Sequence, residues 1–245
     1  MTKKTEQTTE MTIADMSFLP VVGLGADLGA LETLVQSTTY LKRIQLYSKG
    51  KAVDTGKIPP GSFGVPGTDD IQNLGTEIDI IPLVVRPKAI DSKDRDAIIV
   101  SYTEPSEAFQ AIKAASEVKD SKCMWGFAFL VYERSTSEYY EFFFGNKTAR
   151  NEVANVSAFL PRTPDQTAAI TEKIGRAPHP AGPCTIKTKY ITKGDWGWHA
   201  PVTYPCSTPF KGFNRDQAVE QITKFMELKD STIEKAPDDT TSRAR

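Results

Sequence analysis

The sequence predicts a mainly β protein with inserted helices (α+β), in which the strands form an OB-like antiparallel barrel. Two observations predict this class. Segments that alternate apolar and polar residues recur through the middle of the chain, and short turns join two pairs of them. Segments with the apolar spacing of amphipathic helices lie between these strands. A β-sandwich with accessory helices fits the same pattern and is the alternative.

The composition is that of an ordinary globular protein. The chain has 245 residues, with 30 Lys and Arg against 31 Asp and Glu, and 39% of its residues are hydrophobic. These values exclude collagen-like and wholly disordered chains, and the length allows a sizeable core. No apolar run approaches the ~18 residues of a membrane helix, and the start lacks the apolar segment of a signal peptide. With three cysteines, we expect free thiols and a cytoplasmic protein.

The two ends differ in composition from the middle. Residues 1–18 are rich in Thr, Glu and Lys without an apolar period, so we expect a disordered arm, and 234–245 should be a disordered tail. Residues 19–36 predict a short amphipathic helix that packs on its own domain or on a neighbour. The folded part is then a single domain over 40–230, with a Pro/Gly-rich insertion at 161–183.

The first elements of this domain are short. Residues 44–47 alternate as a strand does, and a turn follows at 48–51. Seven Gly and Pro residues in 54–70 indicate a structured loop rather than a helix or a central strand. Residues 77–90 form a long strand, which its two prolines, Pro82 and Pro87, place at an edge or bend at a barrel corner.

The middle of the chain predicts a strand at 97–102, a helix at 104–118 and then a hairpin. Strands at 127–134 and 138–144 flank Ser135–Ser137. Their alternating phenylalanines are expected in the core: Phe127, Phe129, Phe142 and Phe144. A helix over 147–160 turns four apolar residues inward: Ala149, Val153, Val156 and Phe159.

The last third contains a second hairpin and a closing helix. Residues 184–193 alternate strictly, 194–197 turn the chain, and a strand returns over 198–204. A helix at 216–229 carries Ala218, Ile222, Phe225 and Met226 on one face.

Motifs for catalysis are weak. The stretch Gly23–Gly29 has the spacing G-x-G-x-x-x-G, which differs from the dinucleotide fingerprint and is better explained as a helix-entry loop. No P-loop, G-x-S-x-G or H-E-x-x-H motif is present. A zinc site built from His179, Cys184, His199 and Cys206 would have no familiar spacing. Cys206 and His199 form a thiol–base pair only if the turn brings them together. We therefore expect a non-enzymatic protein without metal or cofactor.

Positive charge and aromatic residues coincide in one region. Residues 161–210 have six basic and three acidic side chains, although the whole chain is nearly neutral. Alternation places Lys187 and Lys189 on one face of their strand, with Ile186 and Tyr190 on the other. Indoles offer a face on which any base stacks, at ~1–3 kcal/mol per base, and lysines neutralise phosphates. A purely structural explanation is that the tryptophans fill a barrel end and the lysines protect an edge strand.

The candidate nucleic-acid-binding residues are therefore Arg86, Lys88, Trp125, Lys147, Arg150, Lys187, Lys189, Tyr190, Lys193, Trp196 and Trp198. Lys147 and Arg150 are included because they open a helix, where an anion is favoured.

Two stretches carry a family resemblance. They are Trp198-His-Ala-Pro-Val-Thr-Tyr-Pro-Cys-Ser-Thr-Pro-Phe210 and the Phe-rich strand that ends in Gly145-Asn-Lys-Thr-Ala-Arg150. Over residues 40–210 the chain resembles phage-encoded proteins that include OB-fold single-stranded-DNA-binding proteins. The resemblance implies a DNA-binding protein of phage replication or recombination in the host cytoplasm. It also allows RNA, replication proteins or further copies of the chain as partners.

Two other classes of function remain open. A structural or assembly protein, such as a virion or scaffold component, would use the loop at 54–70 and the arms for contacts. An enzyme would depend on a metal or on Cys206.

Overall fold

The computed structural model describes residues 41–67, 70–94, 98–103, 106–118, 121, 123–174, 180–227 and 231–234. The expected arm at 1–18, the expected helix at 19–36 and the tail beyond Glu234 lie outside the described residues.

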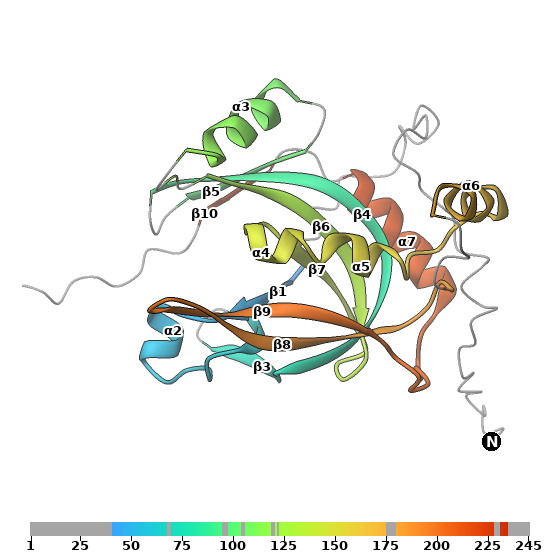
Figure 1. Ribbon diagram of the computed structural model, residues 1–245, viewed down its shortest axis with the longest axis horizontal. Coiled ribbons are helices and arrows are strands. Elements are labelled where there is room, and N and C mark those ends of the chain that lie inside the picture. The colour runs from blue at the N-terminus through green and yellow to red at the C-terminus, as the bar shows by residue number, and fades with distance from the viewer. Residues whose placement is uncertain are drawn as a thin grey trace, which may run out of the picture.

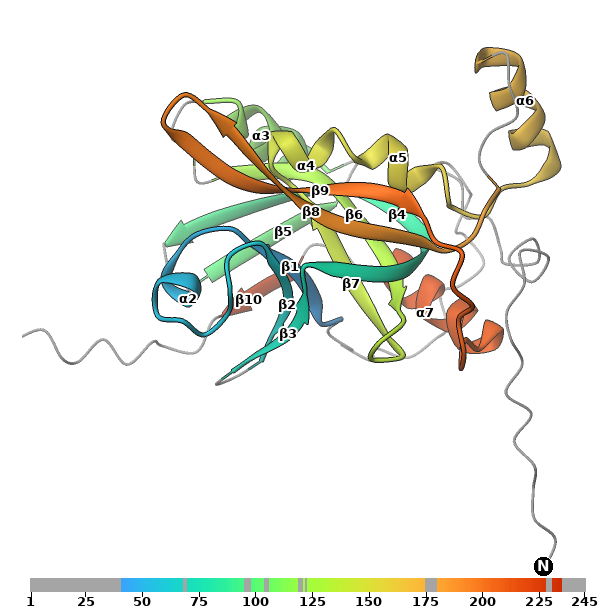
Figure 2. The same cartoon turned by 60° about the horizontal axis from the view of Figure 1, so that its bottom comes forward.

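The described part of the chain has ten strands in one mixed sheet and six helices around it (Figures 1 and 2). The strands are β1 (Arg43–Tyr47), β2 (Ser62–Pro66), β3 (Ile71–Gly75), β4 (Glu77–Asp94), β5 (Ile98–Thr103), β6 (Cys123–Glu133), β7 (Glu138–Phe144), β8 (Cys184–Lys193), β9 (Trp196–Pro205) and β10 (Ser231–Glu234). The helices are α2 (Lys51–Asp54), α3 (Glu107–Ser116), α4 (Lys147–Arg150), α5 (Val153–Ser157), α6 (Pro164–Ile174) and α7 (Arg215–Glu227).

The sheet is open. Its strand order is β10-β5-β4-β6-β7-β1-β2-β3, and the β8–β9 hairpin pairs with the start of β4. The α+β class with a mainly β sheet is confirmed. The closed antiparallel barrel is not, because the described strands β3 and β10 end the order without meeting, and β1 lies parallel to β7.

The long strand β4 is central and bent. It pairs with β8 through Glu77–Ile80, with β6 through Ile80–Asp91 and with β5 from Lys88 onward. Its register shifts after Pro82, in keeping with the predicted bend, and the strand as a whole lies inside the sheet although both prolines are locally at an edge. Within the described ladders, residues 81–87 pair with β6 alone, and this one-sided pairing accommodates two residues that lack an N–H.

The Gly/Pro-rich stretch at 54–70 departs from the prediction. It contains β2, which is paired on both sides, with β1 and with β3. Phe63 and Val65 are buried there. The number of Gly and Pro residues argued against a strand and outweighed these apolar residues. Pro66 is compatible with the strand because it stands at its end, where a missing N–H is tolerated.

Several boundaries shift. The turn expected at 48–51 continues into the short helix α2, and the predicted helix at 147–160 is divided into α4 and α5. Helix α3 begins at Glu107, after Ser106 caps it by accepting a hydrogen bond from the N–H of Phe109. Strand β10 pairs with β5 beyond the predicted end of the domain.

Apolar residues form a cluster on each face of the sheet. One cluster contains the predicted phenylalanines of β6 and β7 and residues of α4, α5 and β8. In Figure 1, α4 and α5 lie between β6 and β9. The other cluster lies under α7, whose Ala218, Ile222 and Phe225 are buried as predicted.

A charged cluster is buried beside the second apolar cluster. The Glu141 carboxylate accepts hydrogen bonds from Lys88 Nζ at 2.8 Å and lies 2.9 Å from Arg43 Nε. Burial lowers the pKa of Lys88 to about 8, although Glu141 acts to raise it. Burial alone would raise the pKa of Glu141, but the positive charges of Lys88 and Arg43 hold it below its usual value. The lowered pKa of Lys88 and the lowered pKa of Glu141 both agree with an excess of positive charge around one carboxylate.

Replacing Glu141 by Gln should destabilise the fold strongly. The substitution leaves Lys88 and Arg43 buried without their counter-charge, which costs about 3–5 kcal/mol of unfolding free energy. Urea unfolding at pH 7 measures the loss. Glu220→Gln is the control, because Glu220 pairs with Lys224 on the exposed side of α7, where ion pairs contribute little. Equal urea unfolding midpoints for Glu141→Gln and Glu220→Gln would contradict a stabilising role for the buried Glu141 ion pairs.

Candidate nucleic-acid interface

The β8–β9 hairpin, residues 184–205, is a two-stranded arm (Figure 1). Lys193 pairs with Trp196, so the turn consists of Gly194 and Asp195 alone. Gly194 has φ +58°, which suits a hairpin turn with glycine at its first central position. The turn is two residues shorter than the predicted 194–197, and Trp196 therefore belongs to the strand.

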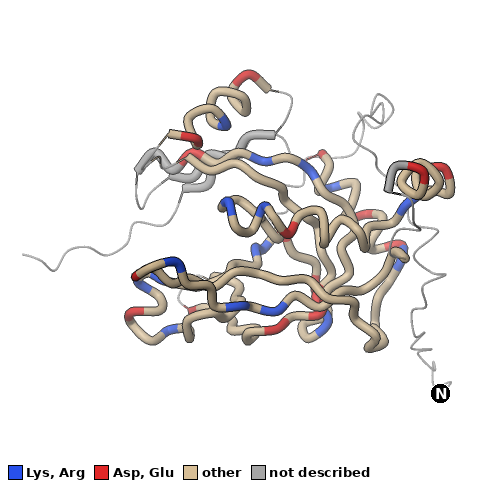
Figure 3. The backbone as a smooth tube through the Cα atoms, in the orientation of Figure 1, with Lys and Arg blue, Asp and Glu red and all other residues tan. Residues whose placement is uncertain are grey.

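The register places lysines and aromatic residues in adjacent rows on one face of the arm. Cross-strand partners point to the same face of a sheet. The pairs on this face are Lys193–Trp196, Ile191–Trp198, Lys189–Ala200, Lys187–Val202 and Thr185–Tyr204. Basic residues recur along β8 and around α2 (Figure 3). The predicted assignment of β8 residues to two faces is confirmed, since Ile186 is buried while Lys187 and Lys189 are exposed.

Aromatic residues of the arm are unusually exposed. Trp196 is 72% exposed, Tyr190 59% and Tyr204 45%, and these are three of the five exposed large hydrophobic residues in the described part of the chain. Trp198 is half-buried, and its indole Nε1 is buried without a hydrogen-bond partner among the described residues. Trp196 therefore faces solvent as expected, whereas Trp198 offers much less of its ring.

The free edge of β9 is blocked against further strand pairing. The N–H of His199 donates to Ser48 Oγ at 2.8 Å, and that of Thr203 donates to Glu152 Oε2 at 3.1 Å. Pro201 and Pro205 alternate with His199 and Thr203 along the same edge of β9, and a proline has no N–H to donate there. An edge in this state does not template a further β-strand. The exposed groups left for recognition are therefore side chains.

Sequence reasoning missed three contributors to this surface. Lys49 lies over the Trp196 ring, with Nζ 5.5 Å from its centre, and Ser48 joins the β1–α2 loop to His199. Tyr204 was missed because its place opposite Thr185 depends on the length of the turn. Residues 48–57 and 184–205 together contain six lysines and two aspartates, and Glu77, Asp79 and Glu152 of other elements also contact the arm.

The lysines of the arm differ in their surroundings. Lys187 forms an exposed ion pair with Glu77 at 2.8 Å, and this contact raises its pKa. Lys189 and Lys193 are exposed, and neither has an ion-pair partner within the described residues. These two ammonium groups are the ones most readily available to an anionic ligand.

Trp125 and Arg150 belong to a separate contact. Arg150 and Lys113 lie 4.5 and 4.6 Å from the centre of the Trp125 ring, and the indole N–H donates to Glu117. Arg150 also donates to the backbone carbonyls of Trp125 and Gly145. These contacts join β6 to α3 and α4, so Trp125 and Arg150 already have partners within the fold. Lys147 is exposed at the start of α4.

The expectation that Arg86 and Lys88 contact phosphates is wrong. They are 7% and 3% exposed. Arg86 lies over the Phe225 ring of α7 at 4.4 Å, and Lys88 pairs with Glu141. Arg86 is covered by Phe225 of α7 and Lys88 by its contact with Glu141 of β7, so neither reaches solvent.

The residues considered for catalysis do not gather. His199 lies opposite Tyr190 and Cys184 opposite Pro205, six residues along β8, which is about 20 Å. Cys206 follows β9 at that same distant end, so it cannot pair with His199. Burial raises the pKa of the Cys184 thiol. His179 lies outside the described residues, and among those described no three His, Cys, Asp or Glu side chains form a metal-binding group.

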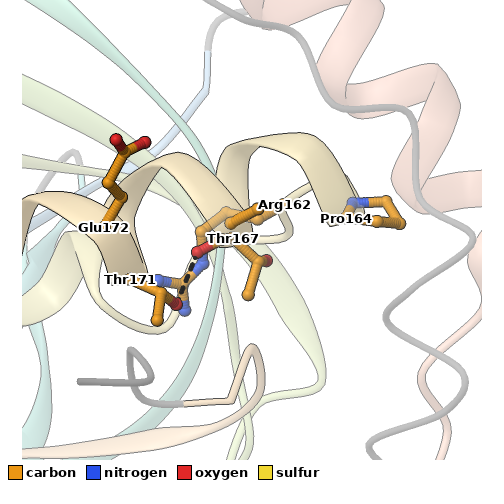
Figure 4. A pocket seen from close by; sticks show the side chains of 6 residues that line it. Arg162, Pro164, Thr167, Thr171 and Glu172 are labelled. Atoms are coloured by element: carbon orange, nitrogen blue, oxygen red, sulfur yellow. Dashed lines mark hydrogen bonds between the residues drawn. The ribbon is translucent and has the colours of Figure 1, made fainter. Parts of the chain in front are cut away.

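An open hollow of about 860 Å³ lies beside α6 (Figure 4). Three of its polar residues are hydrogen-bonded to the backbone. The Arg162 guanidinium donates to the Ala158 carbonyl, and the Thr167 and Thr171 hydroxyls donate to carbonyls one turn earlier. The predicted insertion thus forms a self-contained helix, and none of the candidate residues lines the hollow.

Comparisons with protein-family models, with curated proteins and with solved structures find no match for this chain. In the described residues no helix is long and apolar enough to cross a membrane.

Trp196 should dominate collisional quenching of the intrinsic fluorescence by acrylamide. Its ring is the most exposed of the three indoles, so Trp196→Phe should lower the Stern–Volmer slope. Trp125→Phe is the matched control and should raise the slope, because it removes a less accessible emitter. A lower slope for Trp125→Phe than for Trp196→Phe would show that the arm is not exposed in solution.

Proposed function

We propose that this protein binds single-stranded nucleic acid along its β8–β9 arm and does so without catalysis. The observation that supports this proposal is the pair of adjacent rows on one face, with the exposed Lys187, Lys189 and Lys193 on β8 and, on β9, the exposed rings of Trp196 and Tyr204 and the half-buried ring of Trp198. Each row suits one chemical part of a nucleotide. Ammonium groups attract phosphates, and an exposed indole or phenol ring accepts an unpaired base.

The spacing of the rows supports a strand that runs along the arm. Side chains two residues apart on one face are separated by ~6.6–6.8 Å, and the neighbouring strand lies ~4.8 Å away. A backbone that follows the lysines therefore keeps its bases within reach of β9. Trp196 stacks one base, Lys189 and Lys193 neutralise phosphates, and Lys49 adds charge beside Trp196. Paired bases in a duplex expose no free face, so single strands are preferred.

The biological setting belongs to the same proposal. The resemblance to phage-encoded OB-fold proteins suggests a role in replication or recombination in the host cytoplasm. A bent sheet with an aromatic and basic hairpin is compatible with an OB-like ancestry, in which a hairpin and a sheet face bind oligonucleotides.

The assembly hypothesis has one supporting observation, the helix α6, which projects from the body of the protein (Figure 2). Part of the loop at 54–70, which that hypothesis uses for contacts, is instead the sheet strand β2. Discrete oligomers without affinity for oligonucleotides would favour assembly over nucleic-acid binding.

Oligo-dT should quench the tryptophan fluorescence of the wild-type protein at low salt. Trp196→Ala should weaken binding of a labelled oligo-dT by about 1–3 kcal/mol, measured by fluorescence anisotropy. Val118→Ala is the control, because Val118 is 66% exposed but follows α3, on a different element. Oligo-rU in parallel separates DNA from RNA. Absence of binding by the wild-type protein at low salt would reject the proposal.

Lysine substitutions should alter the salt dependence of that binding. Lys189→Gln and Lys193→Gln should each lower the slope of log K against log salt concentration by about 0.7, the value for one phosphate contact on a single strand. Lys224→Gln on α7 removes an equal charge outside the arm and should leave the slope unchanged. The same slope for all three variants would contradict a phosphate role for the β8 lysines.

A further inference from the structure

The face of the arm opposite to the lysine row carries a second exposed aromatic ring. Tyr190 points to this face together with its cross-strand partner His199 and with Gly197, the partner of Thr192. Nearer the body the same face is buried, since Ile186 is fully covered. Toward the turn the face opens, and Tyr190 is 59% exposed.

The Tyr190 ring is held against β9. A Cβ atom at residue 197 would lie 1.8 Å from the Tyr190 hydroxyl oxygen and 2.4 Å from Cζ, so the ring occupies the space that any side chain there would need. Its centroid lies 5.0 Å from that of the His199 ring, at an interplanar angle of 54°. The His199 ring is itself held in place, because its Nδ1 lies 3.4 Å from Ser48 Oγ and the ring packs against Gly61. The backbone φ of Gly197 lies outside the left-handed region, so space and not strain requires a glycine here.

We infer that Tyr190 is a second base-stacking position and that Gly197 and His199 are the residues that position it. A ring that lies on the strand with much of its surface open is preorganised for stacking, because little rotamer freedom is lost on binding. Lys49 lies on the neighbouring β1–α2 loop. Lys189 and Lys193 lie on the same strand as Tyr190 but on its other face. The arm is two strands wide, about 5 Å between strands, so a flexible single strand reaches both of its faces around the turn.

This inference rests on the proposed function, and its test separates the two. Tyr190→Ala and Gly197→Ala should each weaken oligo-dT binding, by up to the 5- to 150-fold that corresponds to ~1–3 kcal/mol for one stacked base. Because both act through one ring, the double variant should bind no more weakly than Tyr190→Ala alone. Tyr190→Phe keeps the ring and should bind nearly as the wild type does. Thr192→Ala, a change in the partner of Gly197 on the same face, is the control.

Thermal unfolding of each variant is recorded beside the binding curves. If Tyr190→Ala binds as the wild type does while Trp196→Ala is weakened, the proposed function stands and the inference is overturned. A lower melting temperature for Tyr190→Ala with unchanged affinity would show that the ring only covers the glycine. If Gly197→Ala does not fold, the oligo-dT affinities of Tyr190→Ala and Tyr190→Phe still show whether the Tyr190 ring contributes to binding. Absence of wild-type binding would reject the proposed function itself.

Discussion

Four residue pairs hold the arm to the sheet, between Glu77–Ile80 of β4 and Cys184–Lys187 of β8. At this end the arm is buried, with Cys184 and Ile186 in the apolar cluster. Beyond Lys187 the ladder partner of β8 is β9 alone within the described residues. The arm is therefore joined to the sheet at its base, and toward the turn it contacts the β1–α2 loop through Ser48 and His199 while Lys189, Tyr190, Lys193 and Trp196 remain exposed. This anchoring explains how one alternating strand supplies core residues at one end and exposed lysines at the other.

Much of the fold follows from periodicity in the sequence. The hairpin of β6 and β7 is predictable because alternating phenylalanines on both strands need the same buried face. Helix α7 is predictable from its apolar spacing, and β8 from strict alternation. The prediction failed where tertiary contacts override local signals. Strand β2 has glycine and proline within it but is stabilised by neighbours on both sides, and the parallel pairing of β1 with β7 has no local signature.

The candidate site was partly predictable for the same reason. Alternation gives the parity of Lys187 and Lys189, but it does not reveal which face of a strand another element covers. Arg86 and Lys88 also alternate, but Phe225 of α7, far away in the sequence, covers Arg86, and Lys88 is buried with Glu141 of β7. Contacts across such distances, such as Ser48 with His199, need the assembled sheet. Trp125 shows a further limit, because an aromatic residue among basic residues is also the pattern of an internal cation–π contact.

The arm also shows why an almost neutral chain is compatible with an anionic ligand. The net charge of −1 is a sum over the whole molecule, whereas exposed charges act over about a Debye length, ~8–10 Å. Along the arm itself the three lysines of β8 outnumber Asp195, and Lys49 adds a positive charge beside Trp196. An exposed strand with aromatic residues would ordinarily invite aggregation. Here Ser48, Glu152 and two prolines block the β9 backbone, so the exposed rings of β9 have no open β9 edge beside them.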